Sequence, residues 1–551
     1  MSKRITADKQ QIMLLLVLTA IAIGFYVRLD QFLIQTLIDD EWHAVHQLLQ
    51  STPTRIATSF GHADYSIPLT LLYWFEARYF GLSELLMRWP MMLFGLATIV
   101  VFPMYVYRQL SQQEAVLFGF LLALSPVLTI FSRTARPYAI TLFLVYLSVW
   151  AFYKCYDRVD DGTSNNRFIY GAVYCLTAAL AVWLHLIVVF FVFSPFAVEL
   201  VRLLFKSHAD KKRNFVLLLC VGVPTLLVTL ALILPPLLSS FNALTVKAGS
   251  HLPGLDTLVG AVYLWLGTAS GMMVIICYIL AIIGLPRLLK KSIISANILV
   301  GFVLTFVLIV ISQPAWVKHP FTLARYLLPI IPLLLLSIAS GVYVLHNRLI
   351  KRRNLQYSSF VYMAASVCVV TGLIASSPLA GLLHQPNSNT LHPVFYFEFR
   401  PEENDITQYL LKHSYSDFWK SLRNFPPQSK KVAVAPWYFE SHFWHAPIWE
   451  KTSNQDAVPG FLLGLCVKER AGEVPDSPRF RFRNVSYLAN PQDLKRRGID
   501  FIVYQKPNRL NIKTPYTNIS ECDVSLQKIY GQPIYEDTII KVYNPKVMES
   551  T

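Results

Sequence analysis

Long apolar runs recur along the first 380 residues of this 551-residue chain and constrain its fold more than any other feature. A run of about 17 or more mostly apolar residues can cross a bilayer as a helix, with its backbone hydrogen bonds satisfied internally. With 54% hydrophobic and 15% charged residues, the composition excludes a soluble globular protein of this length. We therefore predict a polytopic α-helical membrane protein with about eleven spans. The runs lie at 12–28, 87–107, 114–131, 137–155, 168–184, 186–205, 214–234, 257–285, 293–312, 325–346 and 358–378.

The loop charges set the expected topology. The first run lacks a small-residue cleavage site and is interpreted as a retained helix, and Pro68–Phe80, with Glu76 and Arg78, as an interfacial helix. With the N-terminus inside, every predicted cytoplasmic loop carries Lys or Arg, as the positive-inside rule requires. This distribution accounts for the net charge of +16, and no basic stripe interleaved with aromatic residues indicates a nucleic-acid partner.

The composition changes after about residue 380. Long apolar runs stop, and short β-like segments such as KKVAVAPWYF and DFIVYQK alternate with helix-like polar segments. We predict a transmembrane domain over 1–380, with a first outer loop at about 29–86, and a mixed α/β extracytoplasmic domain over 381–551. Cys466 and Cys522 lie in this polar region, where a disulfide and free thiols are both compatible with the sequence.

Polar residues that could carry chemistry fall on the outer side of the predicted topology. Carboxylates can move a proton, whereas Arg, Lys and Tyr side chains can hold a phosphate, so together they suit an anionic lipid headgroup at the membrane edge. They are Asp39, Asp40, Glu41, His43, His46, His62 and Asp64 in the first outer loop, Arg133, Arg136 and Tyr138 in the second, His185 between two spans, and Lys318, His319, Arg325 and Tyr326 in a later loop.

Four short motifs over about residues 10–380 resemble the GT-C superfamily of polyprenyl-phosphate-sugar-dependent glycosyltransferases. Within it, the likeness is greatest to protein O-mannosyltransferases and the lipid A aminoarabinose transferase. The motifs are the acidic pair Asp40-Glu41, HADYSIPLTLLYW with His62, SRTARPYAITLF with Arg136 and Tyr138, and ARYLLPIIPLLL with Arg325 and Tyr326; His185 in WLHLIVVF resembles a further element. Two departures are that the second outer loop offers arginines instead of a further Asp, and that the family's His-Pro-Pro element is incomplete here.

The resemblance implies a GT-C fold and inverting transfer of a monosaccharide from a polyprenyl phosphate to an extracytoplasmic acceptor hydroxyl on a lipid, glycan or protein. Asp40 would be the general base. Arg325, with Lys318 and Arg136, would hold the leaving phosphate beside Tyr138 and Tyr326. Glu41 would orient the acceptor or bind a divalent metal ion with His43 or His46. His62, Asp64, His185 and His319 would line the pocket.

Simpler interpretations of these residues stay open. The acidic pair could cap the helix that follows it, and Arg325 could snorkel to the interface. His43 and His46, at i and i+3, could be interfacial hydrogen-bonding groups, and His185 could be a satisfied histidine of the bundle.

Rival functions are a lipid-linked substrate transporter or flippase, an oligosaccharide polymerase or ligase, and a ligand-sensing membrane protein. Transporters favour ionisable residues near the midplane and internal repeats, whereas here these residues gather on one face. The expected location is a bacterial inner membrane, with the site and the 381–551 domain on the periplasmic side. The role of that domain is open between acceptor binding, through the aromatic segment PWYFESHFWHAPIW, and scaffolding.

Overall fold

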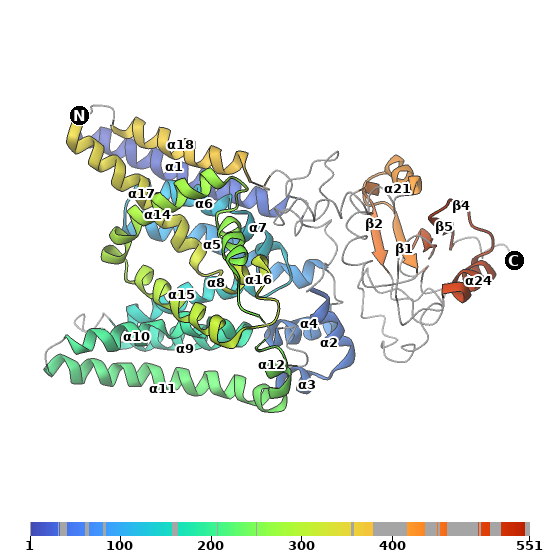
Figure 1. Cartoon of the computed structure of the whole chain (residues 1–551), viewed down its shortest axis with the longest axis horizontal. Helices are drawn as coiled ribbons and strands as arrows, with labels where there is room; N and C mark the ends of the chain where they lie inside the picture. Colours follow the sequence, from blue (N-terminus) through green and yellow to red (C-terminus); the bar gives the residue numbers. More distant parts are fainter. Residues whose placement is uncertain are drawn as a thin grey trace. The chain divides into compact units, whose positions relative to one another are not determined.

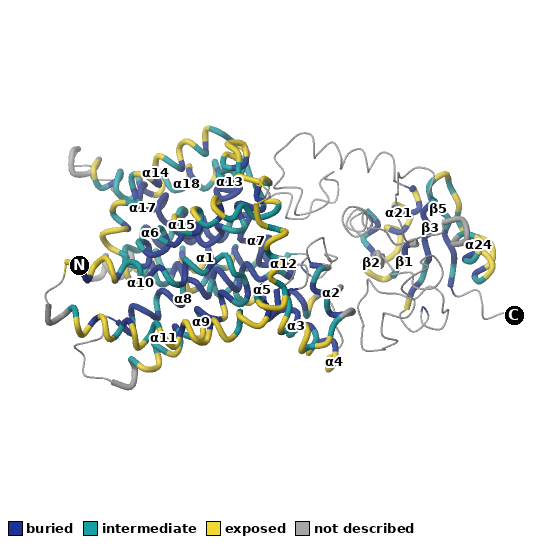
Figure 2. The backbone as a smooth tube through the Cα atoms, turned by 60° about the horizontal axis from the view of Figure 1, so that its bottom comes forward, coloured by how far each residue is buried: buried dark blue, intermediate teal, exposed yellow. Residues whose placement is uncertain are grey.

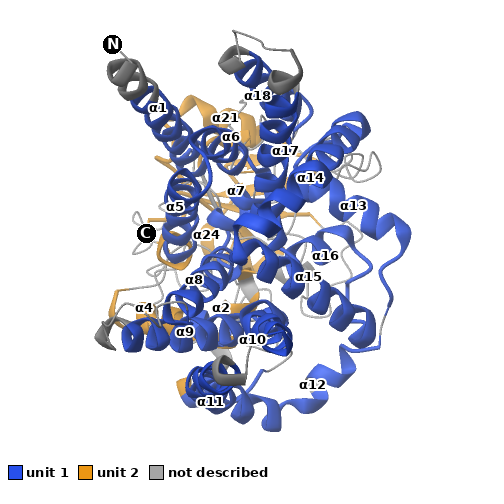
Figure 3. Ribbon diagram, turned by 90° about the vertical axis from the view of Figure 1, so that its left-hand side faces the viewer, with its two compact units in different colours: residues 1–30, 54–69, 89–380 blue, residues 31–53, 70–88, 381–551 orange. Residues whose placement is uncertain are grey.

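The chain divides into two compact units. The computed structural model describes residues 2–30, 32, 41–60, 66–80, 84–156, 164–205, 208–249, 251–353, 358–377, 379, 416–435, 449, 452–459, 494, 498–506 and 519–545, with some side chains in these ranges left out. Unit 1 comprises residues 1–30, 54–69 and 89–380, and unit 2 comprises residues 31–53, 70–88 and 381–551 (Figure 3).

Unit 1 is helical (Figure 1). Its elements are α1 (Ser2–Leu29), α3 (Pro53–Thr58), α6 (Gln112–Ala123), α7 (Pro126–Arg133), α8 (Tyr138–Tyr156), α9 (Ser164–Leu184), η1 (Leu186–Val188), α10 (Val189–Leu204), α11 (His208–Ser239), α12 (Phe241–Val246), α13 (Leu255–Leu266), α14 (Gly271–Lys291), α15 (Ile293–Ser312), α16 (Pro320–Tyr326), α17 (Ile330–Arg353) and α18 (Ser358–Ala375). Helices α4 (Ile67–Tyr79) and α5 (Glu84–Gln109) contribute residues to both units, and the first residue of α3, Pro53, belongs to unit 2.

Among the described residues, nine helices are long and apolar enough to cross a membrane, or ten if the bent pair α6–α7 is one span. These ten and the shorter apolar α18 correspond to the eleven expected runs. Long exposed apolar faces such as that of α11 suit contact with lipid (Figure 2). The prediction of a polytopic helical membrane protein is confirmed, and the segment expected at the interface forms the 13-residue α4.

Two expected spans are interrupted at a Pro or a Gly, and the run 325–346 is divided between α16 and α17. The run 114–131 bends by 56° between α6 and α7, where Pro126 cannot donate a backbone hydrogen bond. The run 257–285 is wrong as a single helix, because Gly267 ends α13 at a φ of +67° and the Ser270 side chain caps α14. Local Pro and Gly chemistry therefore breaks helices that hydropathy alone joins.

Helices α14 and α17 pass each other backbone to backbone. A Cβ atom on Gly284 would collide with the carbonyl oxygen of Ser337, and one on Gly341 with the carbonyl of Leu280. Small residues at such crossings let membrane helices gain dispersion contacts that larger side chains would prevent.

A buried carboxylate ties three spans together at the end of the bundle expected to be cytoplasmic. Glu114, in the first turn of α6, is 0% exposed. Arg287 of α14 donates to its two oxygens from Nε and Nη2, at 3.0 and 3.1 Å. The hydroxyls of Ser340 on α17 and Ser111 at the α6 N-cap each donate to it at 2.6 Å. A fully bonded, paired charge of this kind is tolerated in the interior.

Unit 2 contains a five-stranded sheet in the order β2-β1-β3-β5-β4. Strands β1 (Lys431–Ala435), β2 (Asp456–Pro459) and β3 (Phe501–Gln505) are parallel, whereas β5 (Ile540–Tyr543) runs antiparallel to both β3 and β4 (Tyr535–Glu536). Its remaining elements are α2 (Glu41–Gln50), α21 (Asp417–Ser421), η3 (Leu422–Asn424) and α24 (Ile519–Tyr530). The mixed α/β character expected of the tail is confirmed.

Alternating strand residues cover both faces of this sheet. Ile502 and Tyr504 pack with Leu526 of α24 on one face. Val503 packs on the opposite face with Trp419 of α21. Both faces are therefore closed by helices, as period-two burial requires.

The aromatic segment whose role the sequence leaves open between acceptor binding and scaffolding contributes at least one residue to this core. Trp449 is 1% exposed and stacks on Trp419, with ring centroids 5.1 Å apart and an interplanar angle of 7°. Residues 436–448 of the segment, and Cys466, lie outside the described residues, as does the side chain of Cys522.

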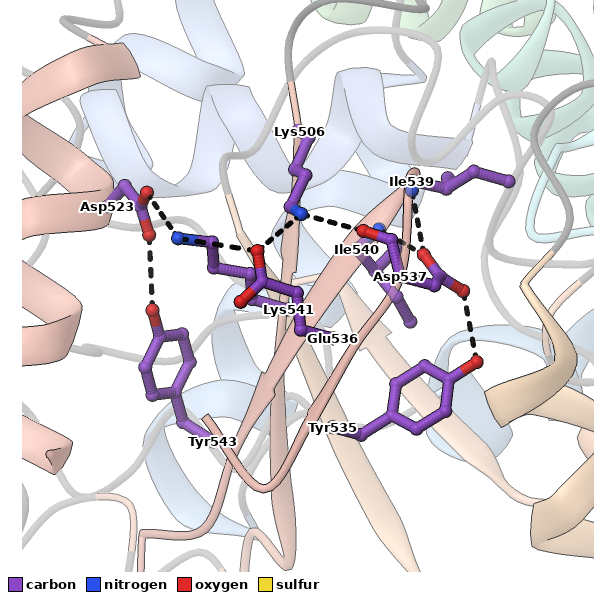
Figure 4. Close-up of polar contacts among 9 residues, drawn as sticks. All are labelled: Lys506, Asp523, Tyr535, Glu536, Asp537, Ile539, Ile540, Lys541 and Tyr543. Atoms are coloured by element: carbon purple, nitrogen blue, oxygen red, sulfur yellow. Dashed lines mark hydrogen bonds and ion pairs between the residues drawn. The ribbon is translucent and has the colours of Figure 1, made fainter. Parts of the chain in front are cut away.

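Charged side chains line the β3–β5–β4 edge of the sheet (Figure 4). Lys541 pairs with Asp523 at 2.8 Å, and Lys506 pairs with Glu536 at 2.6 Å. The carboxylate of Asp537 accepts from the backbone amides of residues 539 and 540, which closes the turn between β4 and β5. Paired charges at an edge discourage further strand pairing.

Candidate functional site

An aromatic and cationic cluster lies where three helix junctions of unit 1 meet. The Tyr138 ring, at the start of α8, is 5.3 Å from the ring of His185, which joins α9 to η1. The His185 ring is 5.7 Å from that of Tyr326, the last residue of α16. Three loops that are far apart in the sequence are thus brought together at one end of the bundle.

Two arginines surround the same ring. The guanidinium carbons of Arg136 and Arg325 lie 6.0 and 5.8 Å from the centroid of Tyr138, within the range of cation–π attraction. Tyr138 is 4% exposed, whereas both arginines are half-buried. Two positive charges held around one ring favour binding of an anion, and guanidinium groups match phosphate oxygens in a bidentate manner.

His185 is a neutral member of this cluster. Burial lowers its pKa to about 3, and the positive charges of Arg136 and Arg325 act in the same direction. Its buried Nδ1 has no hydrogen-bond partner among the described residues. At neutral pH the imidazole is uncharged, so the positive charge at this point comes from the arginines.

Local chain geometry presents these side chains. All of α7 is buried, and three residues after its end the Arg136 amide donates to the Thr134 carbonyl at 2.7 Å. Pro137 then starts the turn into α8, because the Thr141 amide donates to its carbonyl at 2.8 Å. Phe131 of α7 packs on the Tyr138 ring at 4.6 Å. The Arg-Pro-Tyr sequence is therefore held between two packed helices.

The described contacts of Lys318 and His319 are with residues outside the cluster of arginines and aromatic rings. Lys318 is exposed, and its carbonyl accepts from the Thr257 hydroxyl at 2.6 Å. His319 is the N-cap of α16, where its Nδ1 accepts from the Phe321 amide at 3.3 Å. This cap helps to orient the helix that ends in Arg325 and Tyr326.

Glu41 opens α2 in unit 2 and is tied to an arginine that the sequence analysis did not single out. The Arg88 Nε and Nη2 atoms donate to its two carboxylate oxygens at 2.8 and 2.6 Å. The two side chains are 0% and 1% exposed. A buried bidentate pair of this kind anchors the start of α2, immediately after Asp40 in the sequence.

The other predicted residues of the first loop are only partly described. Asp39, Asp40, His62 and Asp64 lie outside the described residues, as does the side chain of His46, whereas His43 is half-buried on α2. Within the described part of the chain, no group of three or more His, Cys, Asp or Glu residues could hold a metal ion.

Sequence reasoning did not find the partners that position these groups. Arg88 lies in the first turns of α5, 47 residues from Glu41, and Arg28 lies at the end of α1. Each of these arginines lies within or beside an apolar run, and this position was the available sequence signal. A charged side chain in a membrane span requires a partner or water, so its presence indicates a buried polar contact. That signal does not identify the partner.

Comparison with known proteins gives structural similarities only. No family model and no curated protein matches the chain. Its fold is similar to that of ArnT from Cupriavidus metallidurans in the apo state, with 14% identity, a TM-score of 0.43 and 97% of each chain covered. The same protein bound to undecaprenyl phosphate gives 14% identity, a TM-score of 0.42, and coverage of 97% of this chain and 98% of that one.

An archaeal oligosaccharyltransferase, AglB from Archaeoglobus fulgidus, is similar over 90% of this chain and 70% of its own, with 13% identity and a TM-score of 0.46. That structure is a complex with an inhibitory peptide and a dolichol-phosphate. Identities of 13–14% and TM-scores below 0.5 assign neither a family nor an activity to the present chain.

Proposed function

We propose that this protein is an integral-membrane inverting glycosyltransferase of the GT-C type. It moves a monosaccharide from a polyprenyl-phosphate donor to the hydroxyl of an extracytoplasmic lipid, glycan or protein. The observation that carries the proposal is the cluster in which Arg136 and Arg325 surround Tyr138 beside Tyr326 and a neutral His185. The acidic pair Asp40-Glu41 and the HADYSIPLTLLYW motif, which lie outside this cluster, add the support of the resemblance to the GT-C superfamily.

In the proposed reaction, the acceptor oxygen forms a bond to the anomeric carbon while the bond from that carbon to the phosphate oxygen breaks. The bonding electrons leave with the phosphate, whose negative charge increases in the transition state. Arg325 and Arg136 offset that charge, and the hydroxyls of Tyr138 and Tyr326 are hydrogen-bond donors to the same oxygens.

Asp40 takes the acceptor proton, a role that rests on the acidic-pair motif. Glu41 supports it indirectly, because the Arg88 pair fixes the first turn of α2. The resemblance gives supporting roles to four further residues. Lys318 helps to bind the phosphate, and the pocket is lined by His62, Asp64 and His319. Glu41 with His43 or His46 is kept as the candidate position for a divalent ion. We place the site on the periplasmic side of a bacterial inner membrane.

The test is transfer of labelled sugar from a panel of polyprenyl-phosphate monosaccharides to a panel of acceptors. Wild-type protein should consume one donor. Asp40→Asn should lose about 10²-fold or more in kcat, as expected for a general base. Arg325→Gln should lose about 10²- to 10³-fold in kcat, as for removal of a charge-stabilising donor.

The matched control is Lys291→Gln, at an exposed lysine at the end of α14. It should act like wild type, and all variants should be compared at equal folded fraction. Wild-type protein that binds the lipid donors and consumes none, with every acceptor class present, would count against the enzyme and favour a transporter or sensor.

A further inference from the structure

The break between α6 and α7 leaves helix carbonyls without their usual partners. In an unbroken helix the amide of residue 126 would donate to the carbonyl of Leu122, but Pro126 has no amide hydrogen. Across the 56° bend, no backbone amide of the described residues outside the helices donates to the Ala123 carbonyl either. Because this break lies within a predicted span, water cannot replace those bonds at low cost.

Arg28, in the last turn of α1, bonds to these two carbonyls. Its Nη1 donates to the Ala123 carbonyl at 2.8 Å and its Nη2 to the Leu122 carbonyl at 3.3 Å, and Nη1 also reaches the Gly24 carbonyl at 3.2 Å. The side chain is 1% exposed. A cation at the C-terminal end of α6 is also favoured by the partial negative charge of that helix end.

Close packing brings Arg28 to this place. A Cβ atom on Gly24, one turn earlier on the same face of α1, would lie 3.0 Å from the Cβ atom of Ala123 and 2.8 Å from Cδ1 of Ile99. Helix α1 can approach the end of α6 this closely because residue 24 has no side chain. The long arginine then reaches the open carbonyls.

The last turn of α1 contacts the C-terminal end of α7 as well as that of α6. The buried Arg133, which ends α7, donates from Nη1 to the Val27 carbonyl at 3.5 Å. The C-terminal end of α6 and the C-terminal end of the eight-residue α7 are therefore both fixed to the last turn of α1. Three residues beyond α7 stands Arg136, followed by Tyr138, so the angle of α7 sets where these two side chains lie.

We propose that Arg28 is a positioning residue for the phosphate site: it replaces the hydrogen bonds lost at Pro126 and thereby holds α7 at the angle that brings Arg136 to Tyr138. The inference rests on the proposed function for its consequence in ligand binding. Arg28 itself touches no substrate, and Lys, which also carries several donors on a long stem, can substitute for it in part.

The test uses the full chain in detergent, with farnesyl phosphate as the probe ligand. Arg28→Met should weaken farnesyl phosphate binding at least tenfold at a temperature where the variant is folded, and Arg28→Lys should recover most of the loss. Glu114→Gln, which disturbs the bundle at its other end, is the control and should change this affinity less than twofold even where it lowers thermal stability equally. Wild-type affinity in folded Arg28→Met would overturn the proposal.

Hydrogen exchange tests whether Arg28 holds α7 in place, and this test does not depend on the proposed function. Amides of residues 122–136 should exchange faster in Arg28→Met and not in Glu114→Gln. Adding Pro126→Ala, which restores an amide donor for Leu122, should reduce the stability lost by Arg28→Met. Unchanged exchange, or an unchanged loss in the Pro126→Ala background, would contradict the role of Arg28. If wild-type protein binds no farnesyl phosphate but Arg28→Met exchanges faster at 122–136, the proposed function fails and the role in holding α7 stands.

Discussion

Breaking the Glu41–Arg88 pair should destabilise unit 2 strongly. Two charge-assisted hydrogen bonds of 2.8 and 2.6 Å join side chains that are 0% and 1% exposed. Removing one member breaks a buried, bidentate ion pair, which costs about 3–5 kcal/mol. We therefore expect Glu41→Gln and Arg88→Met each to lower the free energy of unfolding by an amount in that range.

The double variant Glu41→Leu/Arg88→Met separates pairing from burial. Replacing a buried ion pair by apolar groups of similar volume is often neutral, so the double variant should lose about 1 kcal/mol or less, far below the sum of the single losses. The assay is unfolding in mixed detergent and SDS micelles, followed by circular dichroism. Arg78→Met, at an exposed arginine of α4, is the control and should change stability by about 0.5 kcal/mol or less.

Single losses below about 1 kcal/mol, or losses that simply add in the double variant, would refute this reasoning. The double variant also bears on chemistry. If Glu41 only anchors α2, the folded double variant should keep its sugar-transfer kcat within about tenfold of wild type, whereas Asp40→Asn should lose about 10²-fold or more.

Three further predictions concern other parts of the chain. Gly341→Leu should destabilise the α14–α17 crossing by several kcal/mol, about 3 or more, because its side chain would meet the backbone of Leu280; SDS unfolding measures this, and a loss below about 0.5 kcal/mol would contradict it. The pKa of His185 is lowered from its ordinary 6.5 to about 3, so the unfolded chain binds more protons between these values and stability should fall as the pH drops from 6.5 toward 3. His185→Phe should flatten that dependence, and equal pH profiles of unfolding for the two proteins would argue against the assignment. Burial opposes ionisation of Asp537, but hydrogen bonds from Ser416, from two backbone amides and from Tyr535 outweigh this effect and lower its pKa. Asp537→Asn should therefore lower the free energy of unfolding by about 1–2 kcal/mol above pH 4 and by less below it. A loss of stability that does not depend on pH would speak against this.

The spans could be predicted from sequence because hydrocarbon imposes a minimum apolar length that hydropathy measures directly. The helix breaks within two of the spans also have local sequence signals, namely Pro126 and Gly267. A hydropathy average over a long window does not detect a single Pro or Gly. The sheet strands near 431–435 and 501–505 were visible as short β-like runs, whereas their spatial order depends on long-range pairing that no local pattern contains.

The candidate site also contains contacts that the sequence predicts and contacts that it does not. Arg136 and Tyr138 lie in one short motif, and Arg325 and Tyr326 lie in another. The resemblance assigns both motifs to phosphate binding, so it predicts that the two pairs lie close together. The bond of Arg28 to two helix carbonyls depends on how α1 packs against α6, and the pairing of Glu41 with Arg88 spans 47 residues. Tertiary packing determines these positioning contacts, and a single sequence shows only that each arginine requires some partner.

We propose that Arg136 and Arg325 bind the phosphate of a polyprenyl lipid. The most direct measurement compares the affinities of farnesyl phosphate and the uncharged farnesol for wild-type protein and for Arg136→Gln/Arg325→Gln. Each charge-assisted hydrogen bond contributes about 1.5–3 kcal/mol, so wild type should prefer the phosphate by about 10²-fold or more. The double variant should lose nearly all of that preference while binding farnesol as before. An equal preference in both folded proteins would contradict the account.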